Sequence, residues 1–184
     1  MSELATPSSI DKSAASVKPG MVSQYLIFSL GGELFAVGTL RVREIIEYGN
    51  ITSVPMMPAF IRGVINLRGA VVPVIDLNAR FGRERTQVSR RTCIVILEVH
   101  TDEDTHVLGI IVDAVSAVRQ IDSTQIEPAP SFGTRIRTDF IDGMAKVQNN
   151  FVILLDVGKV LSVDEIAMLS GMGQAGATNA AQQG

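Results

Sequence analysis

Short apolar runs separated by turn residues recur along the chain between about residues 22 and 170. The clearest pair flanks Gly31-Gly32, and two apolar runs joined by a two-residue glycine loop predict a β-hairpin. Other runs alternate with turns in the same way, or are rich in β-branched residues, which favour strands. We therefore expect strands at residues 24–30, 33–37, 63–67, 70–77, 92–100, 106–112, 114–121, 140–147 and 151–155.

The segment 42–48 fits two kinds of element. Val42, Ile45 and Ile46 have the spacing of one face of a helix. Alternation through Glu44, Ile46 and Tyr48 fits a strand instead. Both alternatives stay open from the pattern alone.

Two further signals qualify the strand pattern. Pro73 lies inside an apolar run and lacks an amide hydrogen, so it favours a sheet edge or a bulge. Ser162 and Glu165 form a Ser-x-x-Glu capping box followed by apolar residues, which predicts a helix near the end of the chain.

These elements together favour an all-β barrel or sandwich, because about ten short strands follow one another with regular turn signals. Strands do not alternate with helices, so a doubly wound α/β fold is not expected. Residues 1–20 and 172–184 are rich in small and polar residues, and we expect two disordered tails there.

Composition narrows the function more than the fold. The 184 residues carry a formal charge of −3, one cysteine, two histidines and no tryptophan. A single cysteine rules out an internal disulfide framework, and the weak negative charge argues against a nucleic-acid-binding protein. No apolar stretch suits a secretory signal or a bilayer span, so the expected location is the cytoplasm, without membrane insertion.

No motif supports an enzyme. The acidic residues 102–104 between His100 and His106 lack the spacing of a zinc or EF-hand site and are typical of a solvated hairpin tip. Gly171, Gly173 and Gly176 match a dinucleotide-binding string, but no strand precedes them. Six acidic residues are conceivable catalytic groups without a diagnostic spacing: Glu44, Glu47, Asp76, Asp113, Asp142 and Asp156. The residues alone indicate an interaction module.

The stretch GVINLRGAVVPVIDL at residues 63–77 closely resembles the signature of the chemotaxis coupling protein family, CheW. Further blocks resemble the family in the same order over most of the expected folded body. They are YLIFSLG at 25–31, VREII at 42–46, VPMMPAFIRG at 54–63, GIIVD at 109–113, IEPAP at 126–130, IDG at 141–143 and LLD at 154–156.

The resemblance implies an all-β fold with a minor helix. We expect two small five-stranded SH3-like β-barrels, intertwined over residues 21–171 and packed around a shared core, plus a C-terminal helix. The implied function is a non-catalytic adaptor, without cofactor or metal, that couples chemoreceptors (methyl-accepting chemotaxis proteins) to the histidine kinase CheA. Its partners would be the regulatory domain of CheA, which has the same fold, and the cytoplasmic tip of the receptors. We expect a monomer alone and rings in membrane-associated receptor arrays.

The resemblance also implies two sets of binding residues. The residues implied to bind the kinase are Val42, Glu44 and Gly63. The residues implied to bind receptors are Arg68, Cys93, Val115 and Val118. Arg68 is the signature arginine, and Glu44 is its expected carboxylate partner. Three of these residues have a plainer alternative: Val115 and Val118 fit a core equally well, and Arg68 fits an ordinary surface turn.

Other functions remain open at this point. A coupler that serves an accessory pathway is not distinguished from a flagellar one. A CheV-like fusion carries a receiver domain, whereas this sequence ends in a polar tail, which favours a standalone adaptor. An enzyme on a β-barrel fold would show turnover, and a nucleic-acid-binding barrel would show salt-sensitive binding to a polyanion.

Overall fold

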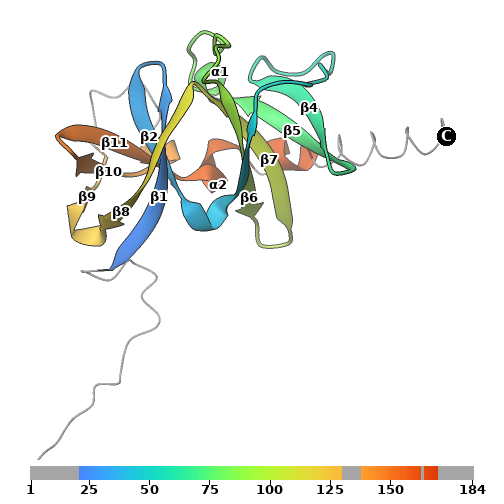
Figure 1. Ribbon diagram of the computed structural model, residues 1–184. Helices are drawn as coiled ribbons and strands as arrows, with labels where there is room; N and C mark the ends of the chain where they lie inside the picture. Colours follow the sequence, from blue (N-terminus) through green and yellow to red (C-terminus); the bar gives the residue numbers. More distant parts are fainter. Residues whose placement is uncertain (1–20, 130–137, 163, 170–184) are drawn as a thin grey trace, which may run out of the picture.

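The computed structural model describes residues 21–129, 138–162 and 164–169, whose strands form two sheets side by side (Figure 1). The first sheet has the order β8 (Ala114–Asp122), β1 (Val22–Leu30), β2 (Glu33–Gly38), β11 (Asn150–Leu155), β10 (Ile141–Val147), β9 (Ile126–Glu127). The second has the order β3 (Val42–Glu47), β6 (Cys93–His100), β7 (Thr105–Val112), β5 (Ala70–Asp76), β4 (Ile61–Leu67).

Each sheet belongs to one lobe, and the chain order interleaves them. The lobe of β3 to β7 is contributed by the middle of the chain, whereas the other lobe combines strands from both sides of it. The prediction of two small SH3-like β-lobes is confirmed. The first sheet differs from five strands by the two-residue β9, which pairs with β10. The two predicted tails lie outside the described residues.

Helical segments are short. They are η1 (Thr39–Arg41), α1 (Leu77–Arg80), η2 (Ser123–Gln125), η3 (Thr138–Phe140), α2 (Val157–Val160) and the helical residues 164–169. The predicted capping box precedes the last of these. The Ser162 backbone N–H donates to Glu165 Oε1 at 2.7 Å, and the Glu165 N–H donates to Ser162 Oγ at 3.1 Å.

The two lobes repeat one structural unit that the sequence analysis did not find. Hairpin β4–β5 leads into α1, and hairpin β10–β11 leads into α2. β5 then pairs in parallel with β7, as β11 does with β2. Asp76 caps α1 and Asp156 caps α2, and their N–H groups donate to the carbonyls of Phe60 and Phe140 at 2.7 and 2.9 Å.

The main core lies between the two sheets. Phe28, Phe35, Phe81 and Phe140 form a chain of ring contacts through it, with neighbouring ring centroids 5.9–6.3 Å apart. A strand that is apolar on both faces contributes side chains to the main core on one face and to a second hydrophobic cluster on the other. In β6, Val95 and Leu97 belong to the main core, whereas Ile94 and Ile96 fill the interior of their own lobe.

Pro73 corrects one expectation. The strand that carries it, β5, is internal to its sheet and lies between β7 and β4. Pairing with β7 extends only from Val74 to Asp76, so the tip of the β4–β5 hairpin projects beyond β7. Proline is tolerated because, at its position, the strand is paired with β4 alone.

Candidate interaction surfaces

A β-bulge resolves the ambiguous segment 42–48. The segment forms β3, an edge strand, and its register against β6 shifts between Val42 and Glu44. Val42 therefore pairs with Leu97 and Ile45 with Val95, both of which belong to the main core. The helix-like spacing of Val42 and Ile45 is thus the signature of an extra residue in a strand.

The same bulge turns Glu44 to the other side of β3, where it meets Arg68. Glu44 pairs with Ile96, which faces the interior of the second lobe. Arg68 stands in the β4–β5 turn with φ of +54°, and its Nη2 lies 2.7 Å from Glu44 Oε2. The arginine side chain is 77% exposed and the carboxylate 22% exposed. The predicted partnership is present.

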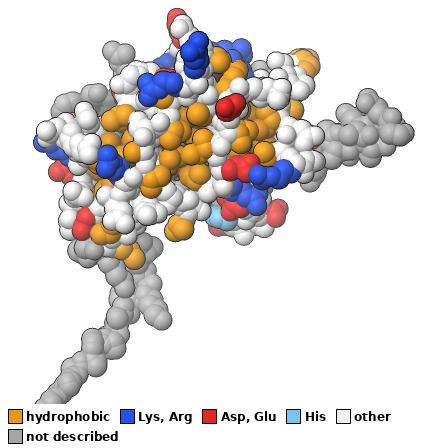
Figure 2. Space-filling model, in the orientation of Figure 1, with side chains coloured by type: hydrophobic (Ala, Val, Ile, Leu, Met, Phe, Trp, Pro, Cys, Tyr) orange, Lys and Arg blue, Asp and Glu red, His pale blue; other side chains and the backbone are white. Residues whose placement is uncertain are grey.

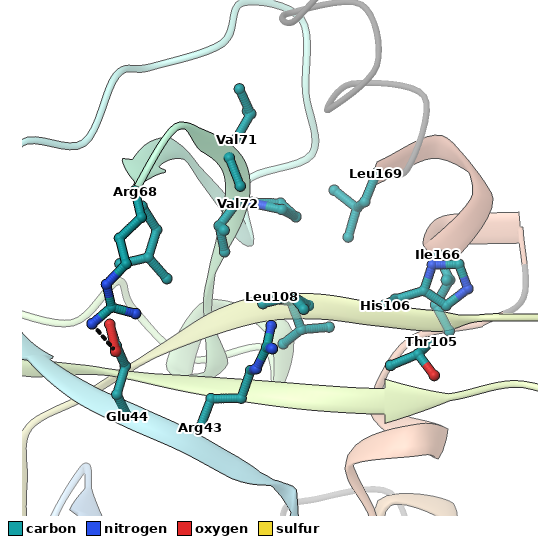
Figure 3. Close-up of a pocket in the computed structure, with 14 residues that line it drawn as sticks. Arg43, Glu44, Arg68, Val71, Val72, Thr105, His106, Leu108, Ile166 and Leu169 are labelled. Carbon is teal, nitrogen blue, oxygen red and sulfur yellow. Dashed lines mark ion pairs between the residues drawn. The ribbon is translucent and has the colours of Figure 1, made fainter.

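This ion pair borders a pocket of about 570 Å³ at the projecting end of the β4–β5 hairpin. Figure 3 shows the Arg68–Glu44 pair on one side of the pocket and Ile166 and Leu169 on the opposite side. Val71, Val72 and Leu108 contribute further apolar walls. The pocket therefore joins a charged rim to an apolar lining, a combination that suits a protein partner better than a metal ion.

Gly63 is buried and acts through its backbone. It follows a bulge in β4 and has φ of +150°, and a Cβ there would overlap the carbonyl oxygen of Thr52. That oxygen accepts the Val64 N–H at 2.9 Å, and the Thr52 N–H donates to the Val64 carbonyl at 2.8 Å. Glycine is required so that the loop before β4 can lie against this strand.

A second bulge accounts for Val115 and Val118. Three positions apart, they would face opposite sides of a regular strand. The register of β8 against β1 shifts there, so that Val115 pairs with Phe28 and Val118 with Leu26, both in the main core. The two valines thus share one face. Val115 is partly buried, whereas Val118 is 53% exposed, so only Val115 fits the alternative of a core residue.

Cys93 extends this face from the second lobe. It pairs with Glu47 at the start of β6 and packs against the main core. Burial, with a smaller contribution from the charge of Glu47, raises the pKa of the thiol. Burial and the neighbouring carboxylate thus keep Cys93 protonated, which is the state of an apolar contact rather than of a nucleophile.

We call Ile45, Cys93, Val115 and Val118 the inter-lobe face. They come from both edge-strand regions that border the main core, β8 of one lobe and β3 with β6 of the other. Figure 2 shows hydrophobic side chains gathered across the middle of this side of the molecule, where β8 and β1 run in Figure 1. Ile45 is 42% exposed and was missed by the sequence analysis. Its spacing of three residues from Val42 indicates a shared face of the strand only if a β-bulge lies between the two residues.

The predicted site residues thus separate into two places. Cys93, Val115 and Val118 lie at the inter-lobe face. Arg68 stands apart from them, in contact with Glu44 at the pocket. Val42 packs against the main core, on the other face of β3 from Glu44.

The candidate catalytic carboxylates mostly have structural partners. Asp76 is fully buried, and its oxygens accept from Arg62, from Thr86 and from the first turn of α1. Asp156 caps α2, and Asp113 accepts the Gly31 N–H at 2.7 Å. Within the described residues no group of three or more acidic, histidine or cysteine side chains could hold a metal ion.

A family model described as the CheW-like domain matches residues 24–165. The chain belongs to the CheW family. The chemotaxis protein CheW of Klebsiella aerogenes is 36% identical over 149 residues, covering 81% of this chain and 87% of the relative. The CheW of Treponema pallidum is 32% identical over 153 residues, covering 81% and 88%.

The fold agrees with a solved structure of the family. The crystal structure of the scaffolding protein TtCheW from Thermoanaerobacter tengcongensis superposes with a TM-score of 0.70 at 35% identity. The match covers 85% of this chain and 96% of that one. The protein is a chemotaxis scaffold, as the resemblance implied. No helix in the described part of the chain has the length and apolar character needed to cross a membrane.

Proposed function

We propose that this protein couples the cytoplasmic tips of chemoreceptors to the regulatory domain of the histidine kinase CheA. It does so by contact alone, in the cytoplasm, and is recruited to membrane-associated receptor arrays through its partners. The observation that carries the proposal is the presence of two different surfaces on one small body, the inter-lobe face and the pocket beside Arg68.

The inter-lobe face is the proposed receptor site. Ile45 on β3 and Val118 on β8 expose large apolar side chains, one from each lobe. Cys93 and Val115 are partly buried and pack against the main core. A face of aliphatic side chains suits an amphipathic helix, which docks on apolar surfaces through its i, i+3 and i+4 residues. Exposed apolar side chains gathered on one face mark an interaction site more often than a chance accumulation.

The pocket end of the second lobe is the proposed kinase site. Glu44 and Val72 line it from two strands, and the Arg68 guanidinium closes its rim. The resemblance placed Arg68 with the receptor-binding residues. Because Arg68 contacts Glu44, we instead propose that the arginine belongs to the kinase site together with its partner. Gly63 contributes by holding β4 and the preceding loop in place.

A third feature supports the proposal that this protein takes part in rings. Phe151 occupies the position in hairpin β10–β11 that Val71 occupies in β4–β5, and it is 63% exposed. The hairpins β4–β5 and β10–β11 therefore have the same backbone arrangement but carry different side chains at matching positions. A contact between unlike ends repeats head to tail and closes into a ring when the rotation allows. Many weak contacts of this kind stabilise an array by raising effective concentration.

Reconstitution of three components tests the proposal. A receptor cytoplasmic fragment, the kinase and this protein are mixed, and the phosphorylation rate of the kinase is measured. We expect kinase activation only when all three are present. The variant Val118→Asp should abolish activation, whereas Gln120→Asp, an exposed change on the same strand, should retain most of it. Full activation by the kinase and receptor without this protein would contradict the proposal.

A further inference from the structure

The chain crosses from the second lobe to the first through a single residue at the end of the inter-lobe face. β7 ends at Val112 and β8 begins at Ala114, so Asp113 is the only residue between these two strands. The other passage between the sheets, from β2 to β3, runs through η1. Its N–H donates to the Ser29 carbonyl at 2.9 Å, and its Oδ2 accepts the Gly31 N–H at 2.7 Å. The start of β8 is thereby tied to the β1–β2 turn.

Arg83 ties the same turn to the second lobe from another direction. It follows α1, and its Nη2 lies 2.7 Å from Glu33 Oε1 while its Nη1 donates to the Leu30 carbonyl at 3.3 Å. The side chain is only 19% exposed. We call Leu30, Gly31, Glu33, Arg83 and Asp113 the inter-lobe lock, since it consists of contacts between groups on both sides of the crossing.

A buried acceptor beside the lock has no hydrogen-bond donor. Thr86 Oγ1 donates its proton to Asp76, so it must accept from the Asn78 amide nitrogen at 2.8 Å. This fixes the Asn78 carbonyl oxygen on the opposite side, where it is buried and unpartnered. Arg83 Nη1 and this oxygen lie 2.7 and 3.4 Å from the point that a Cβ on Gly31 would occupy.

This arrangement gives Arg83 a choice between two acceptors. In the present structure it bonds across the lobes to Leu30, through a long hydrogen bond. The unsatisfied Asn78 oxygen, within its own lobe, is a second acceptor close by, and an unpaired buried oxygen is costly enough to attract a donor. A movement of the guanidinium toward the Asn78 oxygen would weaken its hydrogen bond to the Leu30 carbonyl and leave the two Asp113 hydrogen bonds in place.

We propose that Arg83 and Asp113 are positioning residues that set the spacing of β8 from β3 and so the affinity of the inter-lobe face for receptors. Val115 and Val118 lie on β8 directly after Asp113, whereas Ile45 and Cys93 belong to the other lobe. If the link between β7 and β8 is rigid, the valines on β8 stay at a fixed distance from Ile45 and Cys93, so that one helix can contact both lobes. Preorganisation of this kind raises affinity. The inference rests on the proposed receptor role of the face.

Spin labels measure this spacing directly. In the full chain with Cys93→Ala, labels at Gln120→Cys on β8 and Glu103→Cys in the β6–β7 loop report one distance across the lobes. We expect Arg83→Ala to shift or broaden that distance distribution. In the unlabelled protein that keeps Cys93, the same substitution should weaken binding of a receptor fragment about fivefold. Arg85→Ala removes the same charge from an exposed neighbour and should change neither. Binding to the kinase regulatory domain should stay within about twofold in both variants.

A glycine pair supplies a second, independent perturbation. Gly31→Ala places a methyl group 2.7 Å from Arg83 Nη1, whereas Gly32→Ala meets nothing within 4 Å. Both residues have positive φ, so the backbone strain is shared. Only Gly31→Ala should reproduce the distance change of Arg83→Ala.

The outcomes separate the two proposals. An unchanged distance in Arg83→Ala, or a changed distance with unchanged receptor affinity, overturns the role of the lock. Loss of affinity without any distance change also overturns it, because Arg83 would then contact the receptor itself. If Val118→Asp binds the receptor fragment as well as the unchanged protein does, the receptor role of the face fails instead.

Discussion

At position 63 the backbone leaves room for a hydrogen atom and no more. The overlap with the Thr52 carbonyl and the positive φ act together, so a side chain there must move the loop before β4. The site residue predicted for kinase binding is therefore first a structural requirement. We expect a substitution there to act on binding only through the placement of Glu44, Arg68 and the rest of the pocket.

Replacing this glycine should destabilise the fold. We expect Gly63→Ala to lower the free energy of unfolding by about 3 kcal/mol, because strain and a backbone clash add. Gly69→Ala is the matched control, since Gly69 has φ of +88° but nothing within 4 Å of an added Cβ. The control should lose about 1 kcal/mol. Urea denaturation of both variants measures the difference, and equal losses would contradict the close approach.

Cys93 should react as a protected thiol. Burial, and to a lesser degree the charge of Glu47, raises its pKa, so the folded protein binds this proton more tightly than the unfolded chain. The stability that this gives is complete below the unfolded thiol's pKa and is lost as pH rises through the folded one. The midpoint of the iodoacetamide rate against pH should lie above that of a free cysteine. A midpoint at or below the ordinary value would contradict the assigned environment.

At the scale of elements, the turns between strands could be predicted from the sequence, whereas the β-bulges within strands could not. Gly31-Gly32, Arg68-Gly69 and Gln148-Asn149 all adopt positive φ. The first hairpin was expected from its glycine pair, and the strands on both sides of the other two turns were also expected. Each of the bulges after Val42 and Val115 inserts one extra residue into its strand. The bulge in β3 gives its apolar residues the spacing of a helix face. The bulge in β8 makes the strand look apolar on both faces. Period-based reasoning therefore found β8 but left β3 open between a helix and a strand, and it could not assign the faces of either.

The repeated helix caps give a matched comparison. Asp76 and Asp156 cap equivalent helices, but Asp76 is fully buried against Arg62, at 2.9 Å, whereas Asp156 is partly exposed. Asp76→Ala should therefore cost about 4 kcal/mol, because it also leaves the Arg62 charge unpaired in a largely buried site. Asp156→Ala should cost about 1 kcal/mol, the value of an N-cap alone. Thermal unfolding of the two variants checks the difference, and equal costs would contradict the pairing.

At the scale of the molecule, family resemblance located the function and the structure separated its surfaces. Composition alone had indicated only an interaction module, because one cysteine and two histidines left little catalytic material. The resemblance paired Arg68 with Glu44, but the sequence could not show that Val118 lies on the other lobe, because that depends on how the lobes interleave. The repeat that relates β4–β5 to β10–β11 was likewise hidden, because few of its residues are identical.

The central claim is that these two surfaces serve different partners. Its most direct measurement is the affinity of two variants for two ligands, the receptor cytoplasmic fragment and the kinase regulatory domain, by titration calorimetry. We expect Val118→Asp to weaken receptor binding at least tenfold and to leave kinase binding unchanged. Arg68→Ala should do the reverse, with unfolding free energies within about 0.5 kcal/mol of the unchanged protein, because both side chains are exposed. Parallel losses of both partners in either variant would contradict the account.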